Sequence, residues 1–425
     1  MLTQIRKENK DQLISYLQSR NQEISADILV AVSKIIEDVR KNKDDAVRQY
    51  TKQYDGIDLE DYKVSEKELE AAIQKNDPAF MEAMQLAKEN IETFHKAQRQ
   101  NNYMLMQEPG IYLGQRVIPL ASVGIYVPGG RAQYPSSVLM NAIPAKVAGV
   151  KRIVMVTPPN KEGTISPTIA YAAKLAGVTE IYKVGGAQAI AALAYGTKTL
   201  DPVDKIVGPG NIYVAAAKKM VFGKVDIDMI AGPSEILVIA DEKANPVYVA
   251  ADLLSQAEHD PMASPILLTT SSEILKQVNM QLKEQTEKLP KKSIVLESLK
   301  NYGKSIVCDS ISECIQYANQ IAPEHLELQV ENPMEYLNAI KNAGSVFLGY
   351  YSCESVGDYF GGCNHVLPTS GTARFSSALG VDSFIKKSSY LYYSKEALEK
   401  NGKYIMEIAK QEDLQAHANA VKVRI

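Results

Sequence analysis

Residues 123–159, VGIYVPGGRAQYPSSVLMNAIPAKVAGVKRIVMVTPP, decide the fold class. An apolar run at 123–127 leads through a glycine-bearing turn into an Ala-rich segment at 136–148, and a second apolar run follows at 152–157. A short buried strand, a helix and another buried strand in this order predict a βαβ unit. Since a helical crossover joins parallel strands, we expect a parallel sheet covered by helices on both faces.

The alternation continues along the chain. Further helices are expected at 166–176, from 187 and at 212–221, and further strands at 180–184, 205–207 and 235–241. A second alternating stretch over residues 246–348 predicts a second α/β domain, including a helix at 333–342. The charged, helix-periodic residues 1–100 predict a helical flank. A Lys/Glu-rich helix is expected at 394–411, before a strand-like ending, VKVRI.

The composition excludes several classes of protein. The 425 residues are 45% hydrophobic and 23% charged, which argues against a disordered or fibrous chain. A formal net charge of −3 and the lack of a basic run argue against a nucleic-acid partner. Without a signal peptide or a long apolar run, we expect a cytoplasmic protein with no membrane partner. The four cysteines include no CxxC pair and are expected to be free thiols.

Three glycine-bearing turns each follow an expected strand and precede an expected helix. They contain Tyr126, Gln188 and Asn211, at residues 126–130, 184–188 and 208–211. Such turns present backbone N–H groups to phosphates at the carboxyl ends of parallel strands. None matches a known phosphate-binding motif, so each alone is more often a structural tight turn. Their succession on one sheet favours a nucleotide site.

Candidate metal or acid–base residues lie near four of the five histidines. Gln256 and His259 share a face at the end of an expected helix, although a solvated helix end is the more common explanation of such a pair. Asp358 and His365 lie in a glycine-rich loop, and Glu412 and His417 in a segment that reads as a frayed tail. An HExxH motif is absent, and these fragments form no recognised zinc motif by themselves.

The pair Glu324–His325 follows a proline and enters an expected strand. A histidine titrates near neutrality and suits repeated proton abstraction, whereas an adjacent glutamate can activate water. A lone Glu–His pair is weak evidence for catalysis, because such neighbours also occur without any function.

Taken together, several stretches resemble the histidinol dehydrogenase family. The matching sequences, in chain order over residues 115–425, are VGIYVPGGRAQYPSSVLMNAIPAKVAGV, VGGAQAIAALAYGT, DKIVGPGNIYVAAAK, DMIAGPSEILVIAD, DLLSQAEHD, IAPEHLEL, ESVGDYFGGCNHVLPTSGTAR and LQAHANAVKVRI. The resemblance implies two Rossmann-like α/β domains, one inserted in the other, with small helical N- and C-terminal domains. The implied boundaries are 1–23 with 379–391 for a small helical domain, 24–125 with 236–378 and 126–235 for the Rossmann-like domains, and 392–425 for the tail.

The same resemblance implies the oxidation of L-histidinol to L-histidine through a bound aldehyde, with two NAD consumed and one Zn²⁺ per active site. It also implies a homodimer in which Glu412 and His417 complete the neighbouring site. The residue roles it implies are a catalytic pair Glu324 and His325; metal ligands Gln256, His259, Asp358 and His417; NAD contacts Tyr126, Gln188 and Asn211; and substrate contacts Ser234, Gln256, His259, His325, Asp358, His365, Glu412 and His417.

Two other functions compete with this interpretation. In a thiol-dependent aldehyde dehydrogenase, Cys363 or Cys353 would act as a covalent nucleophile. A nucleotide-binding scaffold without enzymatic activity would carry the polar clusters as surface groups only. Loss of activity on zinc chelation would distinguish the metal-dependent enzyme from both.

Overall fold

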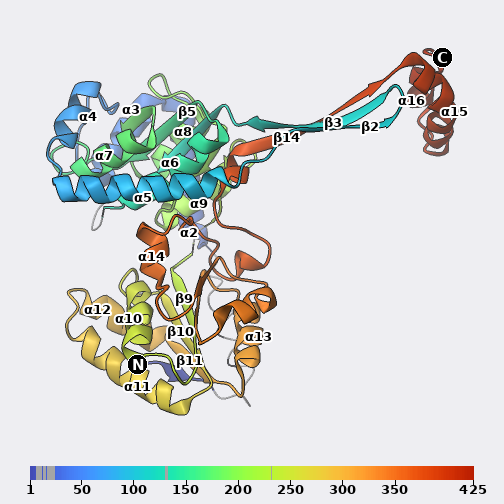
Figure 1. Cartoon of the computed structure of the whole chain (residues 1–425). Helices are drawn as coiled ribbons and strands as arrows, with labels where there is room; N and C mark the ends of the chain where they lie inside the picture. The colour runs from blue at the N-terminus through green and yellow to red at the C-terminus, as the bar shows by residue number, and fades with distance from the viewer. Residues whose placement is uncertain (6–11, 13–15, 17–23, 130–132, 231) are drawn as a thin grey trace.

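The computed structural model describes residues 1–5, 12, 16, 24–129, 133–230 and 232–425. The described chain forms two α/β lobes and a long projecting arm that ends in two helices (Figure 1). Each lobe is built on a parallel sheet, as the sequence predicts. Among the described residues, no helix combines the length and the apolar character that a membrane crossing needs.

The first lobe contains the sheet predicted from residues 123–159. Its strands lie in the order β6 (Glu180–Lys183), β5 (Arg152–Thr157), β4 (Ser122–Tyr126), β7 (Lys205–Val207) and β8 (Asp226–Ile227). One face packs against α4 (Glu66–Ile73), α5 (Pro78–Lys96), α6 (Pro135–Ala148) and α7 (Pro167–Ala176). The other packs against α2 (Ala26–Asn42), α3 (Asp44–Asp55), α8 (Gly186–Tyr195) and α9 (Ile212–Val221).

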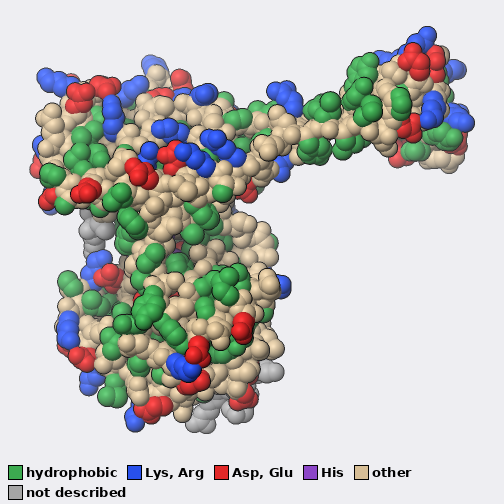
Figure 2. Space-filling view, in the orientation of Figure 1, with side chains coloured by type: hydrophobic (Ala, Val, Ile, Leu, Met, Phe, Trp, Pro, Cys, Tyr) green, Lys and Arg blue, Asp and Glu red, His purple; other side chains and the backbone are tan. Residues whose placement is uncertain are grey.

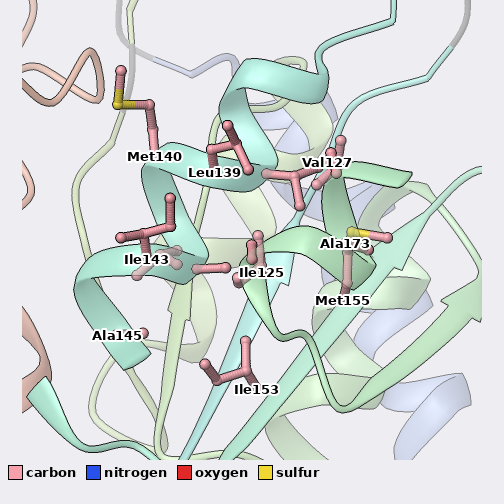
Figure 3. Packing of buried hydrophobic residues seen from close by; sticks show 14 of the residues in the cluster. Ile125, Val127, Leu139, Met140, Ile143, Ala145, Ile153, Met155 and Ala173 are labelled. Carbon is pink, nitrogen blue, oxygen red and sulfur yellow. The ribbon is translucent and has the colours of Figure 1, made fainter. Parts of the chain in front are cut away.

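Strands β4 and β5 are apolar on both faces because both faces are covered. In β5, Ile153 and Met155 belong to one core cluster and Val154 and Val156 to the other. Successive side chains of a strand point to opposite faces, so a continuous apolar run is what a doubly covered parallel strand requires. Figure 3 shows the first of these clusters, where Leu139 of α6 packs near β4 and β5.

The second lobe has the strand order β1 (Thr3–Gln4), β11 (Lys304–Val307), β10 (Ser264–Thr269), β9 (Glu235–Ala240), β12 (His325–Gln329) and β13 (Ser345–Leu348). The helices α10 (Pro246–Ala257), α11 (Ser272–Thr286) and α12 (Lys292–Asn301) pack on one face. Helix α13 (Ile311–Ile321) covers the other face. The 3₁₀ helix η1 (Pro333–Ala339) and the short helix α14 (Glu354–Tyr359) follow.

The arm is an antiparallel sheet of β2 (Tyr103–Glu108), β3 (Ile111–Pro119) and β14 (Ile385–Tyr393). The short 3₁₀ helices η2 (Thr372–Arg374) and η3 (Val381–Phe384) precede β14. Beyond β14, the helices α15 (Lys395–Gln411) and α16 (Gln415–Lys422) pack against each other at the far end. Figure 1 shows this end and the C-terminus far from both lobes.

The packing corrects several sequence-based boundaries. The implied boundaries group residues 24–125 with 236–378. Instead, the apolar faces of helices α2–α5 cover the first sheet, and β4 is a strand of that sheet. These elements therefore pack with residues 126–235. The segment 379–391 is mainly strand β14 rather than helix. Of the expected helical segment 1–23, most lies outside the described residues, and β1 joins the second sheet. The C-terminal VKVRI continues from α16 and is not a strand, and residues 333–342 form a 3₁₀ helix only to Ala339.

A buried ion pair fixes the turn after β7. The side chains of Lys218 and Asp228 are 3% and 1% exposed and pair with each other. Lys218 Nζ also donates to the Gly208 carbonyl oxygen at 2.9 Å, and the Gly208 N–H donates to Asp228 Oδ2 at 2.8 Å. Gly208 has a φ of +108°, and a Cβ there would lie 2.2 Å from the Tyr126 carbonyl oxygen. The turn that precedes Asn211 is therefore held from both sides.

We predict that Lys218→Met lowers the free energy of unfolding by about 3–5 kcal/mol, because it leaves the Asp228 carboxylate buried and unpaired. Urea-induced unfolding measures the change. Lys243→Met is the matched control, since it removes an ion pair with Glu331 whose side chains are 56% and 59% exposed. The control should lose less than about 1 kcal/mol. Equal losses in the two variants would contradict this prediction.

Candidate active site

His325 is the first residue of β12, in the interior of the second sheet next to β9. Its ring is buried, and Nδ1 lies 2.9 Å from the Glu235 carbonyl oxygen. A carbonyl oxygen only accepts, so Nδ1 carries the hydrogen of this bond. Nε2 has no hydrogen-bond partner within the described part of the chain and lies 3.6 Å from Asp358 Oδ1. The backbone therefore holds the ring with Nε2 directed toward α14.

Glu324 and Glu235 bind each other's backbone. The Glu235 N–H donates to Glu324 Oε2 at 2.9 Å, and the Glu324 N–H donates to Glu235 Oε2 at 3.3 Å. Glu324 Oε2 also lies 3.7 Å from His325 Nδ1. Ser234 directly precedes Glu235, so it sits at the same edge of the sheet. The sequence analysis missed Glu235. No local sequence pattern shows that its backbone N–H pairs with a side chain 89 residues away.

Asp358 and His365 lie between the two lobes. His365 Nδ1 is 2.9 Å from the Asp358 carbonyl oxygen, and its Nε2 is 3.3 Å from Ser137 Oγ in α6 of the first lobe. The neighbouring Asn364 donates to the Met140 carbonyl oxygen, also in α6, at 2.7 Å. This loop therefore joins the second lobe to the first at the site.

Gln256 and His259 come from the end of α10, as predicted. Gln256 is buried, and its Nε2 donates to Glu354 Oε1 at 2.6 Å. One carboxyl oxygen of Glu354 in turn lies within 4.8 Å of a carboxyl oxygen of Asp358, one helical turn later. His259 is exposed as a residue. Partial desolvation of its ring lowers its pKa, and the nearby charge of Asp358 raises it by a smaller amount. The structure thus places Gln256 against Glu354 of the cluster, and His259 within range of the Asp358 charge.

The charges of the cluster shift several pKa values. Burial by itself would lower the pKa of His325, but the carboxylates of Glu324 and Asp358 outweigh it and raise the pKa to about 9. Burial would raise the pKa of Asp358, but His325 and His365 hold it well below its usual range. Burial and the Asp358 carboxylate raise the pKa of Glu354 to about 8. Burial lowers the pKa of His365. One carboxylate of the cluster therefore stays ionised while its neighbour is readily protonated.

Glu354 is a site residue that the sequence analysis missed. Ligand atoms of His325, Glu354 and Asp358 lie within 4.8 Å of one another, close enough to hold a metal ion. The spacing of Glu354 and Asp358 by four residues on one helix is the signal that could have revealed it.

The candidate nucleotide residues lie at the carboxyl edge of the first sheet. Tyr126 ends β4, and its hydroxyl accepts from the Gly186 N–H at 3.1 Å. Gln188 is fully buried, and both polar atoms of its side chain lack hydrogen-bond partners in the described chain. Asn211 caps α9 by accepting from the N–H groups of Tyr213 and Val214. Tyr126 therefore ends a strand, Asn211 directly precedes α9, and Gln188 lies in the first turn of α8 rather than in the turn before it.

Glu412 and His417 are not brought to this cluster within one chain. Both are exposed and lie in the helical pair at the far end of the arm, away from α14 and β9 (Figure 1). Of the residues expected to contact substrate or metal, these two alone are separated from the others in the described structure.

Two parallel α/β lobes with a buried His–carboxylate cluster between them define the class of two-domain α/β enzymes. A family model described as histidinol dehydrogenase matches residues 18–425. The protein named histidinol dehydrogenase in Clostridium acetobutylicum is 58% identical over 408 residues, which cover 96% of this chain and 95% of that one. The protein of the same name in Listeria innocua is 54% identical over 413 residues, which cover 97% of this chain and 96% of that one. The crystal structure of histidinol dehydrogenase from Elizabethkingia anophelis is 45% identical, with a TM-score of 0.95, covering 100% of this chain and 98% of that one. The chain belongs to the histidinol dehydrogenase family and is an oxidoreductase.

We predict that in the metal-free protein His325 titrates with a midpoint near pH 9, the raised value of its pKa. Because this pKa lies above the value of about 6.5 in an unfolded chain, the imidazolium stabilises the fold fully below about pH 6.5, and the contribution is lost as pH rises through 9. Asp358→Asn should lower the midpoint, since it removes a carboxylate beside Nε2.

NMR of ring-labelled histidine measures this midpoint, and the chain has only five histidines to assign. Glu258→Gln is a control, because Glu258, at the end of α10, is not among the carboxylates that raise the pKa of His325. An unchanged midpoint in Asp358→Asn would contradict the electrostatic origin of the shift.

Proposed function

We propose that the chain oxidises L-histidinol to L-histidine, the last step of histidine biosynthesis, in two successive hydride transfers to NAD through bound L-histidinaldehyde. Membership of the histidinol dehydrogenase family supports the reaction. The observation that carries it is the buried His325 Nε2, which has no hydrogen-bond partner in the described chain and lies 3.6 Å from Asp358 Oδ1, while Nδ1 is fixed on a backbone carbonyl. A ring held in this way presents Nε2 to a substrate, and Nε2 accepts a proton once the imidazolium has lost its own.

His325 and Glu324 divide the proton transfers in this proposal. His325 Nε2 accepts the hydroxyl proton during oxidation of the alcohol, because it is the ring atom that faces the cluster. Glu324 is fixed by the Glu235 N–H and acts as the base toward water in the aldehyde-to-acid step, the only step that consumes water. Substrate contacts fall to Ser234, Gln256, His259, His325, Asp358 and His365, with Glu412 and His417 supplied by a second subunit.

The donor set fits one Zn²⁺ held by Gln256, His259 and Asp358 of one subunit together with His417 of the partner subunit. An amide oxygen, a carboxylate and imidazole nitrogens are ligands that zinc accepts, and the lowered pKa of Asp358 keeps its carboxylate ionised as a ligand must be. When bound, the metal would orient the substrate and polarise its reacting oxygen. For NAD, the unpartnered polar atoms of the buried Gln188, two residues after the Gly186 that donates to the Tyr126 hydroxyl, support a ligand at the carboxyl edge of the first sheet.

The arm supports a homodimer. Met104, Met106 and Leu391 are 62%, 61% and 65% exposed, and hydrophobic side chains line the arm in Figure 2. Isolated arms of this kind bury little apolar surface within one chain, whereas a second copy would cover them reciprocally. The exposed His417 and Glu412 at the end of the arm would then reach the cluster of the other subunit.

We predict that each histidinol yields two NADH, and that a zinc chelator abolishes turnover until Zn²⁺ is restored. Absorbance at the NADH band measures the yield. Cys353→Ser and Cys363→Ser are the controls and should retain activity, because neither thiol belongs to the cluster of His325. Chelator-resistant turnover that disappears in a cysteine variant would instead support the thiol-dependent mechanism.

We predict that mixing inactive His417→Ala and inactive His325→Ala subunits restores activity. In a mixed dimer, one site combines an intact His325 with an intact His417 of the partner subunit. With random exchange, half of the dimers are mixed and each has one working site, so recovery should reach about one quarter of wild-type activity. No recovery after subunit exchange has been verified by mass spectrometry would exclude a composite site.

A further inference from the structure

Glu354 connects helix α14 to the last turn of α10. Its side chain is buried, Oε1 accepts from Gln256 Nε2 at 2.6 Å, and Oε2 accepts from Ser255 Oγ at 2.7 Å. Both carboxyl oxygens are therefore engaged by neighbouring residues of one helix. No role for this residue follows from the proton transfers assigned to Glu324 and His325.

The bond to Gln256 determines which way the amide faces. A glutamine amide carries its oxygen and its NH₂ group on opposite sides, and rotation about the last torsion exchanges them at little cost. Metals bind such an amide through the oxygen. Because Glu354 accepts from the NH₂ group, the Gln256 oxygen must point away from Glu354. Without Glu354, the amide could turn its NH₂ group toward a metal.

Glu354 is itself held in place by the second sheet. Its backbone N–H donates to Glu327 Oε1 at 2.8 Å, and Gln329 Nε2 donates to Glu327 Oε2 at 3.0 Å. Glu327 and Gln329 belong to β12, the strand that begins with His325. Gln329 Nε2 also donates to Asp252 Oδ2 of α10 at 2.6 Å. A buried polar network thus fixes Glu354 relative to both the catalytic histidine and α10.

We infer that Glu354 is a positioning residue that orients the Gln256 amide oxygen toward the metal, and that it is not itself a ligand. The inference rests on the proposed zinc role of Gln256. Outer groups that orient ligands in this way change metal affinity by about 10–100-fold when removed. The alternative is that Glu354 binds the metal directly with His325 and Asp358, the other residues whose donor atoms lie within 4.8 Å.

A double-mutant cycle on the full-length protein distinguishes these roles. The dissociation constant for Zn²⁺ is measured by competition with a chromophoric chelator, a readout independent of turnover. Glu354→Leu keeps the side-chain size but removes both acceptors, and it should weaken zinc binding by about 10–100-fold. In a Gln256→Ala background, the same change should have little further effect, because Glu354 acts through that amide.

Two further variants control for indirect effects. Glu354→Gln keeps an oxygen that can accept from Gln256 Nε2 and should restore most of the affinity. Ser255→Ala removes the other donor to Glu354 but leaves the Gln256 bond, and should weaken binding by about threefold or less. Glu354→Ala is made in parallel with Glu354→Leu, and thermal unfolding of the metal-free proteins identifies the variant that folds.

The outcomes separate this inference from the proposed function. Equal, additive losses in Glu354→Leu with and without Gln256 would overturn the inference alone and favour Glu354 as a direct ligand. Unchanged zinc affinity in Glu354→Leu would also overturn it. Unchanged affinity in Gln256→Ala would overturn the proposed ligand set, and the inference with it.

Discussion

The paired backbone and side-chain bonds between Glu235 and Glu324–His325 hold the site together. They tie the first residue of β9 to the first residue of β12 and to the residue before it. One carbonyl oxygen fixes the ring of His325, and the same glutamate accepts from the Ser370 N–H of the returning loop at 2.9 Å. Because these bonds are buried, losing one leaves an unsatisfied polar group, which costs about 1–3 kcal/mol. The sheet therefore sets the position of His325 Nε2.

The two lobes direct opposite edges of their sheets toward the site around His325. Tyr126 and the turn at Gly208 lie at the carboxyl edge of the first sheet, whereas Glu235 and His325 lie at the amino edge of the second. The short segment between β8 and β9 leads directly from one edge to the other, and Asp228 fixes its start on Lys218. In the proposed function, an electron acceptor at the first edge and a substrate at the second would meet between the lobes.

The arm bears on both the proposed dimer and the proposed ligand set. It carries Glu412 and His417 away from Asp358, and it leaves Met104, Met106 and Leu391 exposed to solvent. Burying one such side chain contributes about 1.5–3 kcal/mol, so the proposed second copy would stabilise the extended apolar arm by covering it. If the dimer forms as proposed, assembly completes both the fold of the arm and the ligand set.

The sequence alone determined the parallel α/β class, the βαβ units and the three turns at Tyr126, Gln188 and Asn211, because apolar runs, helical periodicity and glycine are local signals. It also marked His325 and Asp358 as candidates, but their meeting depends on contacts between β12 and α14 that no local pattern encodes. Tertiary structure alone decided that α2–α5 cover the first sheet and that residues 379–391 form part of an arm. It likewise decided that Glu354 lies against Gln256, 98 residues earlier, since packing of distant segments sets such contacts.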